Sequence, residues 1–113
     1  MTANSEPSET DAAFDSLAKS LPLHQVDESL MFGCRNLLTG GHMFAVLYHG
    51  SLAVKLGRGT AGFDEAAALQ GATAWYPTGP TRPFLDWVLM PPTSTRNWVR
   101  LGELAFDRIR STL

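Results

Sequence analysis

Residues 42 to 56 read HMFAVLYHGSLAVKL, and this stretch decides the fold. From His42 to Tyr48, apolar side chains fall on both faces of an extended chain, which is typical of a strand in the middle of a sheet. His49-Gly50 separates this run from Ser51 to Leu56, where apolar residues alternate, and glycine can supply the positive φ of a two-residue turn. The stretch therefore predicts a central β-hairpin.

The residues before the hairpin predict one helix and one further strand. Residues 11 to 21 carry apolar side chains at helical spacing, and Pro22 ends that helix because proline cannot continue the hydrogen-bond ladder. Residues 29 to 38 are expected to be extended as a single segment. Gly33 is interpreted as a bulge or kink within it.

The residues after the hairpin predict a short helix at 62–69, strands at 73–76 and 83–90, and a final helix capped by Thr93 or Ser94. The final helix is the clearest element because its charged residues are kept apart from one mainly apolar face, which is formed by Trp98, Leu101, Gly102, Ala105, Ile109 and Thr112. The order α-β-β-β-α-β-β-α predicts an α+β protein with two layers and a mainly antiparallel, five-stranded sheet packed by helices.

Length and charge indicate one domain and argue against direct binding of nucleic acid. The chain has 113 residues, of which 44% are hydrophobic, so we expect one domain at 11–113 behind a disordered acidic tail at 1–10. The first fifteen residues carry four acidic and no basic side chains, which leaves nine basic and seven acidic side chains in the rest. A nucleic-acid-binding face is normally far more basic.

The single cysteine, Cys34, allows no internal disulfide, so a reducing cytoplasm is the expected location. No apolar run approaches the roughly 20 residues that a membrane span requires, and we expect no contact with a membrane. The first eleven residues have neither a basic nor an apolar segment, so no secretory signal is expected either.

Several short motifs follow one another in an order that is similar to a known family. The chain resembles the N-terminal domain of the TfoX/Sxy family, small bacterial proteins named after regulators of natural competence, over about residues 11–112. The residues that carry the resemblance are Met31-Phe32-Gly33, Gly41 to Ala45, Leu52 to Leu56, Ala72, Arg82-Pro83-Phe84 and Trp98 to Ala105.

The resemblance implies the fold α-β(3)-α-β(2)-α, which is similar to that of YgaC-like proteins and secretion chaperones. It is consistent with a non-catalytic interaction or regulatory role, although stand-alone members of the family generally have no assigned biochemistry. Two features depart from the family. Cys34 stands where the family often has a second glycine, and the chain ends at Leu113, so we expect the C-terminal domain of the full regulators to be absent.

The loop at Gly57-Arg58-Gly59-Thr60-Ala61-Gly62 spells G-x-G-x-x-G between a strand and a helix. A dinucleotide site also needs a parallel βαβ unit and an acidic residue about 20 positions later, where this chain has Pro77. We therefore expect no nucleotide cofactor. The alternatives that remain are an anion or small-ligand site at Gly57, Arg58, Gly59 and Gly62, and a glycine loop without a ligand.

The candidate catalytic and metal-ligating residues form no familiar constellation. His24, His42, His49 and Cys34 lack the spacing of a metal site, so no metal is expected. Cys34 and His42 flank the first predicted hairpin, whose turn is expected at Thr39-Gly40-Gly41, and could approach each other. A small buried Cys34 is the alternative, and no third orienting group is evident. The sequence therefore predicts no catalytic site and no cofactor.

Two further groups of residues are candidates for contacts with partners. The run from Phe84 to Met90 is apolar on both faces except at Asp86, and at a sheet edge its residues Phe84, Asp86, Trp87 and Val88 would pair with another chain. The second group, which consists of Trp75, Trp87 and Trp98 together with Phe84, could line a ligand pocket. Large aromatic side chains in so small a domain are more often part of the core, so a core position is the favoured prediction for the three tryptophans.

The basic residues Arg96, Arg100 and Arg110 share one face of the last helix. Glu103 and Asp107 share that face at spacings suited to ion pairs within the helix, so a solvated and self-neutralised face is favoured over a phosphate-binding one.

Two hypotheses follow from the sequence. The first is a non-catalytic interaction module that binds an unknown protein partner or a second copy of itself through the surface of the sheet or the strand at Phe84–Met90. The second is a small-ligand or anion-binding protein that uses the Gly57–Gly62 loop with Arg58, Lys55 or Arg82.

Overall fold

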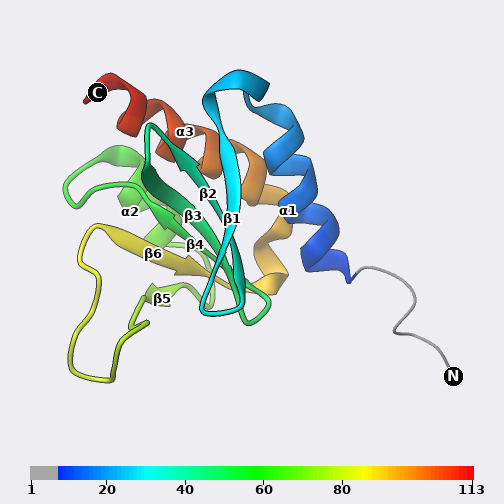
Figure 1. Ribbon diagram of the computed structural model, residues 1–113. Coiled ribbons are helices and arrows are strands. Elements are labelled where there is room, and N and C mark those ends of the chain that lie inside the picture. The colour runs from blue at the N-terminus through cyan, green and yellow to red at the C-terminus, as the bar shows by residue number, and fades with distance from the viewer. Residues whose placement is uncertain (1–7) are drawn as a thin grey trace, which may run out of the picture.

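The computed structural model describes residues 8–113, which form an antiparallel sheet with helices packed against it (Figure 1). In chain order the elements are α1 (Glu9–Ser20), η2 (Leu23–Gln25), β1 (Asp27–Met31), β2 (Cys34–Thr39), β3 (His42–Tyr48), β4 (Ser51–Lys55), α2 (Ala61–Ala67), β5 (Thr73–Ala74), β6 (Trp87–Met90), η3 (Pro92–Asn97) and α3 (Trp98–Ser111). The strand order across the sheet is β1-β2-β3-β4-β6-β5. The predicted α+β class is confirmed, but the sheet has six strands rather than five.

The additional strand arises because residues 29–38 form parts of two strands rather than one. Met31 and Cys34 are directly paired, so Phe32 and Gly33 make a two-residue turn in which both residues have positive φ, 52° and 77°. The interpretation of Gly33 as a bulge was therefore wrong. Turns of this kind favour Asn or Asp at the first position. Because this chain has Phe32 there, the sequence did not indicate the turn.

The N-terminal helix begins earlier than the sequence predicted. Ser8 caps it, because its Oγ accepts a hydrogen bond of 3.0 Å from the N–H of Asp11. Helix α1 thus starts at Glu9, inside the segment that was predicted to be a disordered tail. The rest of that predicted tail, residues 1–7, lies outside the described residues.

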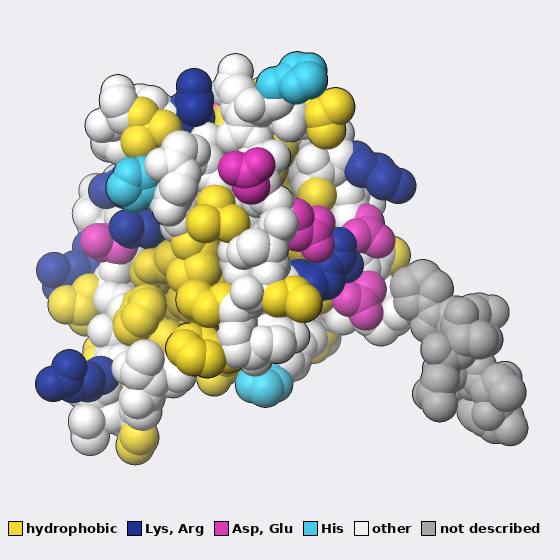
Figure 2. Space-filling model, in the orientation of Figure 1, with side chains coloured by type: hydrophobic (Ala, Val, Ile, Leu, Met, Phe, Trp, Pro, Cys, Tyr) yellow, Lys and Arg dark blue, Asp and Glu magenta, His cyan; other side chains and the backbone are white. Residues whose placement is uncertain are grey.

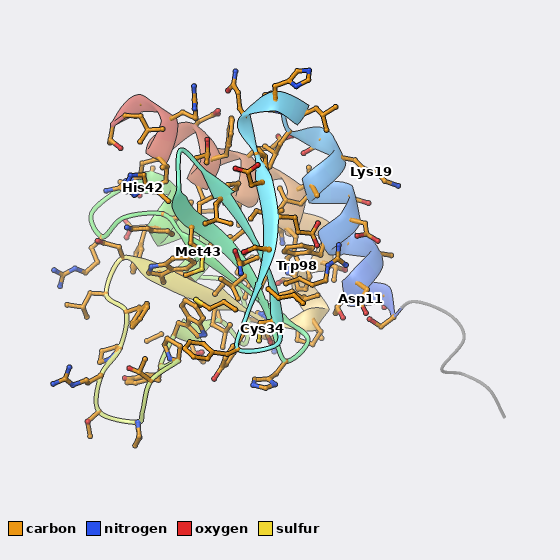
Figure 3. All side chains as sticks on the ribbon, in the orientation of Figure 1. Asp11, Lys19, Cys34, His42, Met43 and Trp98 are labelled. Carbon is orange, nitrogen blue, oxygen red and sulfur yellow. The ribbon has the colours of Figure 1, made fainter. Side chains whose placement is uncertain are left out.

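Helices α1 and α3 cover one face of the sheet, and the main core lies between them and the strands (Figure 1). The predicted apolar face of the last helix is confirmed, since Trp98, Leu101, Ala105 and Ile109 are buried there. Trp98 is labelled between the strands and α1 (Figure 3).

Strand β3 is apolar on both faces because each face packs against a different apolar cluster, and a β-bulge places two consecutive residues on the same face. The register between β2 and β3 shifts between Leu37 and Leu38, which is the mark of a β-bulge. Phe44 and Ala45 both join the core beneath the helices, whereas Val46 joins a second cluster. The prediction that this strand is central is confirmed, because β2 and β4 flank it.

The opposite face of the sheet carries this second, smaller apolar cluster. Hydrophobic side chains gather on that face over β4 and β6 and toward the segment between β5 and β6 (Figure 2). That segment, residues 75–86, contributes Trp75 and Phe84, which pack with Val46, Ala53 and Trp87. Because Trp75 turns in to join this cluster, the strand predicted at 73–76 is only the two residues of β5.

Candidate functional site

The glycine loop and the Phe84–Val88 stretch, which the sequence presented as separate candidates, are joined through Asp86. The N–H groups of Leu56 and Gly57 donate to the main-chain oxygen of Asp86, at 3.0 and 2.9 Å. The N–H of Arg58 donates to Oδ1 of the same residue at 3.1 Å. These three hydrogen bonds continue the β4–β6 pairing beyond Lys55 and Trp87.

The loop depends on glycine where its backbone turns. Gly57 and Gly59, on either side of Arg58, have φ of +83° and +87°, which residues with a Cβ rarely adopt. A Cβ at Gly57 would also overlap the guanidinium of Arg108, whereas nothing lies within 4 Å of one at Gly59. Gly62 needs no such freedom, because it lies within α2.

The amide groups at the start of α2 are partly used inside the protein. Thr60 Oγ1 accepts a hydrogen bond of 3.1 Å from the N–H of Phe63, and its hydroxyl lies 2.9 Å from the carbonyl oxygens of Leu56 and Gly57. The N–H of Arg58 is bonded to Asp86. The anion-binding hypothesis for this loop therefore depends on the side chain of Arg58 more than on main-chain amides.

Arg58 borders a groove that both candidate stretches help to form. We call it the Arg58 groove. Helix α2 contributes Phe63 and Ala67, strand β5 contributes Ala74, and the stretch before and within β6 contributes Phe84 and Trp87. Its volume is about 340 Å³, equal to about eleven molecules of liquid water at ~30 Å³ each.

The chemistry of the Arg58 groove is mostly apolar with one cation. Among the described residues that line it, only Arg58 has a charged side chain. Thr73 and Tyr76 each add a hydroxyl group. The large side chains of Tyr76 and Leu85, which also line it, are exposed. A concave apolar surface with few polar groups is the usual character of a small-molecule site.

Aromatic packing holds one wall of the groove in place. The ring of Trp75 lies 4.8 Å from that of Trp87 and 5.3 Å from that of Phe84. The carbonyl oxygen of Trp75 accepts a hydrogen bond of 2.8 Å from the N–H of Phe84, which closes the 75–86 segment. The predicted core position of Trp75, Trp87 and Trp98 is confirmed, and Trp87 also lines the groove.

The predicted partner-contact strand does not lie at an edge of the sheet. Strand β6 runs between β4 and β5, and Val88 pairs with Val54 on one side and with Ala74 on the other. The edge position on which pairing with another chain was conditional is therefore not present where this stretch is paired with β5. The long open edge of the sheet is instead β1, with Leu30 71% exposed on it.

Cys34 and His42 do not meet. His42 pairs with Thr39 at one end of the β2–β3 hairpin, and Cys34 begins β2 at the other end; Figure 3 shows the two residues far apart on the sheet. Cys34 lines a small cavity of about 150 Å³ together with His49 and Trp75. Trp75 is 1% exposed, and its Nε1 has no hydrogen-bond partner among the described residues.

The arginines of the last helix make contacts with other elements. Arg100 forms an ion pair with Glu65 of α2, and Arg110 Nη1 donates to Thr39 Oγ1 at 3.4 Å. The predicted pairs with Glu103 and Asp107 are not among the ion pairs of residues 8–113. Cross-element contacts were not visible from spacing along one helix.

Sequence reasoning missed a charged cluster around Arg35. Its guanidinium donates to Glu28 at 2.7 Å and to Asp15 at 2.5 Å, lies 3.6 Å from Asp11, and stacks over the ring of Phe14. The hydrogen bond to Glu28, followed by that to Asp15, raises the pKa of Arg35 above its ordinary value, against the opposing effect of burial. Recognising the turn at 32–33 would have indicated the cluster, because it brings Glu28 near Arg35.

Comparisons with known proteins give no relative. No family model, curated protein or solved structure matches the chain, so the resemblance to the TfoX/Sxy domain stays a prediction. Within residues 8–113, no helix has the length and apolar character to cross a membrane. In the same part of the chain, His, Cys, Asp and Glu form no group of three or more that could hold a metal ion.

Proposed function

We propose that this protein is a non-catalytic binding module whose small apolar ligand occupies the Arg58 groove. The observation that carries the proposal is the mostly apolar lining of the groove, which encloses about 340 Å³ and so falls within the range of ~300–1,000 Å³ that is usual for ligand sites. Its lining offers apolar contact from two directions, Phe63 and Ala67 on α2 and Phe84 and Trp87 on the far wall. Covering such surface is favourable by about 25 cal/mol per Å².

The groove is also held in shape before any ligand arrives. Asp86 links the glycine loop to β6, and Trp75 supports Phe84 and Trp87 from the side. A preformed site loses less conformational entropy when it binds. The resemblance to the TfoX/Sxy domain supports a role without catalysis, and the lone Cys34 supports a reducing compartment such as the bacterial cytoplasm.

Hydrocinnamyl alcohol is a suitable neutral probe, because its phenyl ring and short chain form an apolar body that is small enough to enter the groove. Titration into nitrogen-15-labelled protein should shift the amide NMR signals of Ala67, Ala74 and Val88. Signals at Gly41 and Leu113, which do not line the groove, should not move. For so small a ligand we expect a dissociation constant on the order of millimolar.

A matched pair of variants tests whether the groove is the site. Ala67 and Ala68 are neighbouring, exposed residues, and only Ala67 lines the groove. Ala67→Phe should abolish the NMR shifts because the ring fills the groove, whereas Ala68→Phe should leave them unchanged. Shifts that survive in Ala67→Phe, or that never occur in the natural protein, would refute the proposal.

A second candidate function is self-association through the exposed edge of β1. Leu30 on this strand is 71% exposed and Phe32, at its turn, is 89% exposed. The strand contains no Pro or Lys of the kind that blunts edges. Two copies that pair antiparallel about Ser29 would place Asp27 and Glu28 opposite Met31 and Leu30, so the acidic side chains would not face each other.

Sedimentation equilibrium tests this candidate directly. We expect a dimer at high protein concentration that Leu30→Glu converts to a monomer, because the new carboxylate would lie directly opposite Glu28 of the second copy. Leu23→Glu is the control, since Leu23 is 83% exposed but lies in η2. A natural protein that stays monomeric, or an equal loss in both variants, would count against the edge.

A further inference from the structure

We infer that the ligand of the Arg58 groove is an apolar monocarboxylate, with its carboxylate against Arg58 and its apolar body between α2 and the Phe84–Trp87 wall. This inference rests on the proposed function, since it concerns the chemistry of the same site. It is carried by the single cationic side chain at the border of an apolar groove. A ligand that complements this surface has one anionic end and one apolar end.

The guanidinium of Arg58 is available for such a ligand. Among residues 8–113 the ion pairs of arginine involve Arg35 and Arg100, and the only hydrogen bond of Arg58 to a side chain is made by its main-chain N–H. That hydrogen bond, with Gly57 and Gly59 on either side, fixes the backbone from which the side chain extends. A guanidinium matches the two oxygens of a carboxylate with two parallel N–H groups.

A carboxylate fits this site better than a phosphate. Phosphate sites usually add several main-chain amides to a basic side chain. Of the glycine loop and the first turn of α2, only Arg58 and Phe63 line the groove, and their N–H groups are already bonded to Asp86 and Thr60. A doubly charged phosphate would leave excess negative charge beside apolar walls and near the carboxylate of Asp86, which is unfavourable, whereas a single negative charge is balanced by Arg58.

The test compares three probes with the same apolar body, namely hydrocinnamate, hydrocinnamyl alcohol and hydrocinnamyl phosphate. Dissociation constants come from the NMR shifts of Ala67 and Ala74. We expect hydrocinnamate to bind about fivefold more tightly than the alcohol, which is the size of effect that a partly exposed ion pair supplies. We also expect it to bind more tightly than the phosphate.

Variants of Arg58 test whether its side chain causes the preference for the carboxylate over the alcohol. Arg58→Met should reverse the order of acid and alcohol, because an unpaired carboxylate loses hydration without compensation, while affinity for the alcohol stays nearly constant. Arg58→Lys should retain part of the preference, since it keeps the charge without the planar fork. Arg82→Met is the matched control, because Arg82 is an exposed arginine that does not line the groove, and it should change nothing.

The outcomes separate this inference from the proposed function. If the alcohol binds at the groove but the acid binds no better, or if Arg58→Met leaves their ratio unchanged, the carboxylate inference is wrong and the groove is still a binding site. Tighter binding of the phosphate overturns the inference in favour of a phosphate ligand. If none of the three probes shifts the groove signals, both the inference and the proposed function fail.

Discussion

The carboxylate of Asp86 accepts a hydrogen bond from the main-chain N–H of Arg58 at 3.1 Å, and the main-chain oxygen of Asp86 accepts two more from Leu56 and Gly57. One residue thus ties the glycine loop to the strand that forms the far wall of the groove. The position of Arg58 relative to Phe84 and Trp87 therefore depends on Asp86. This relationship has consequences that can be measured.

Replacing Asp86 with alanine removes the acceptor for the Arg58 N–H. Because Asp86 is half-buried, we expect Asp86→Ala to lower the free energy of unfolding by about 1 kcal/mol in urea titrations. Asp86→Asn keeps a carbonyl oxygen as acceptor and should lose less than half as much. Asp107→Ala, on the exposed side of α3, serves as the control. Equal stability of the alanine and natural proteins would contradict this account of the loop.

Gly57 and Gly59 offer a comparison in which only one site is crowded. Both have positive φ, so Gly→Ala at either position should destabilise the protein by roughly 1 kcal/mol. Gly57→Ala should be the worse of the two, because its Cβ would overlap Arg108. In an Arg108→Ala background the difference between them should disappear. Chemical denaturation of the four variants measures this, and a difference that persists would mean the crowding is not due to Arg108.

Gly102 lets α1 approach α3. A Cβ there would come within 2.5 Å of Leu17 Cδ2, and Leu17 is fully buried. Although alanine favours a helix over glycine, we expect Gly102→Ala to destabilise the protein by about 1–3 kcal/mol through overpacking. Combination with Leu17→Ala should cost less than the sum of the two single changes, as thermal or urea unfolding would report. Additive losses would show that the helices move apart instead.

Phe32 carries an unfavourable backbone conformation in an exposed turn. Its φ is 52° and its side chain is 89% exposed, so asparagine should relieve strain and give up little buried surface. We expect Phe32→Asn to raise the free energy of unfolding by about 1 kcal/mol. Leu23→Asn, at another highly exposed apolar residue, should change it by less than half of that. A loss of stability in Phe32→Asn would indicate that the Phe32 ring makes contacts that its exposure does not suggest.

The elements with strong local signals were predicted well. The central hairpin from His42 to Leu56 and the apolar face of α3 follow from residue periodicity alone, because that periodicity states which side chains must be buried. The turn at 32–33 was missed because Phe32 is not a residue that such turns favour. For the same reason, five strands were predicted where the sheet has six.

The candidate site was predicted only as separate parts. Arg58, Phe84, Asp86 and Trp87 were each singled out, but as two unrelated sites. Their union depends on the antiparallel pairing of β4 with β6 and on the insertion of Trp75 beneath the 75–86 segment. The local sequence pattern does not indicate which distant strands pair with each other. These residues therefore come together only through the pairing of strands in the folded sheet.

The amino-acid sequence by itself determined the α+β class, the central hairpin and the buried faces of the helices. These depend on local spacing of apolar residues and on the turn chemistry of glycine and proline. The tertiary structure decided which strand lies at the edge, which partners Arg35 and Arg100 take, and that Arg58 faces an apolar groove. Those features depend on contacts between segments that are distant in the sequence. Such contacts stabilise the protein only after the segments have packed together, so no local pattern indicates them.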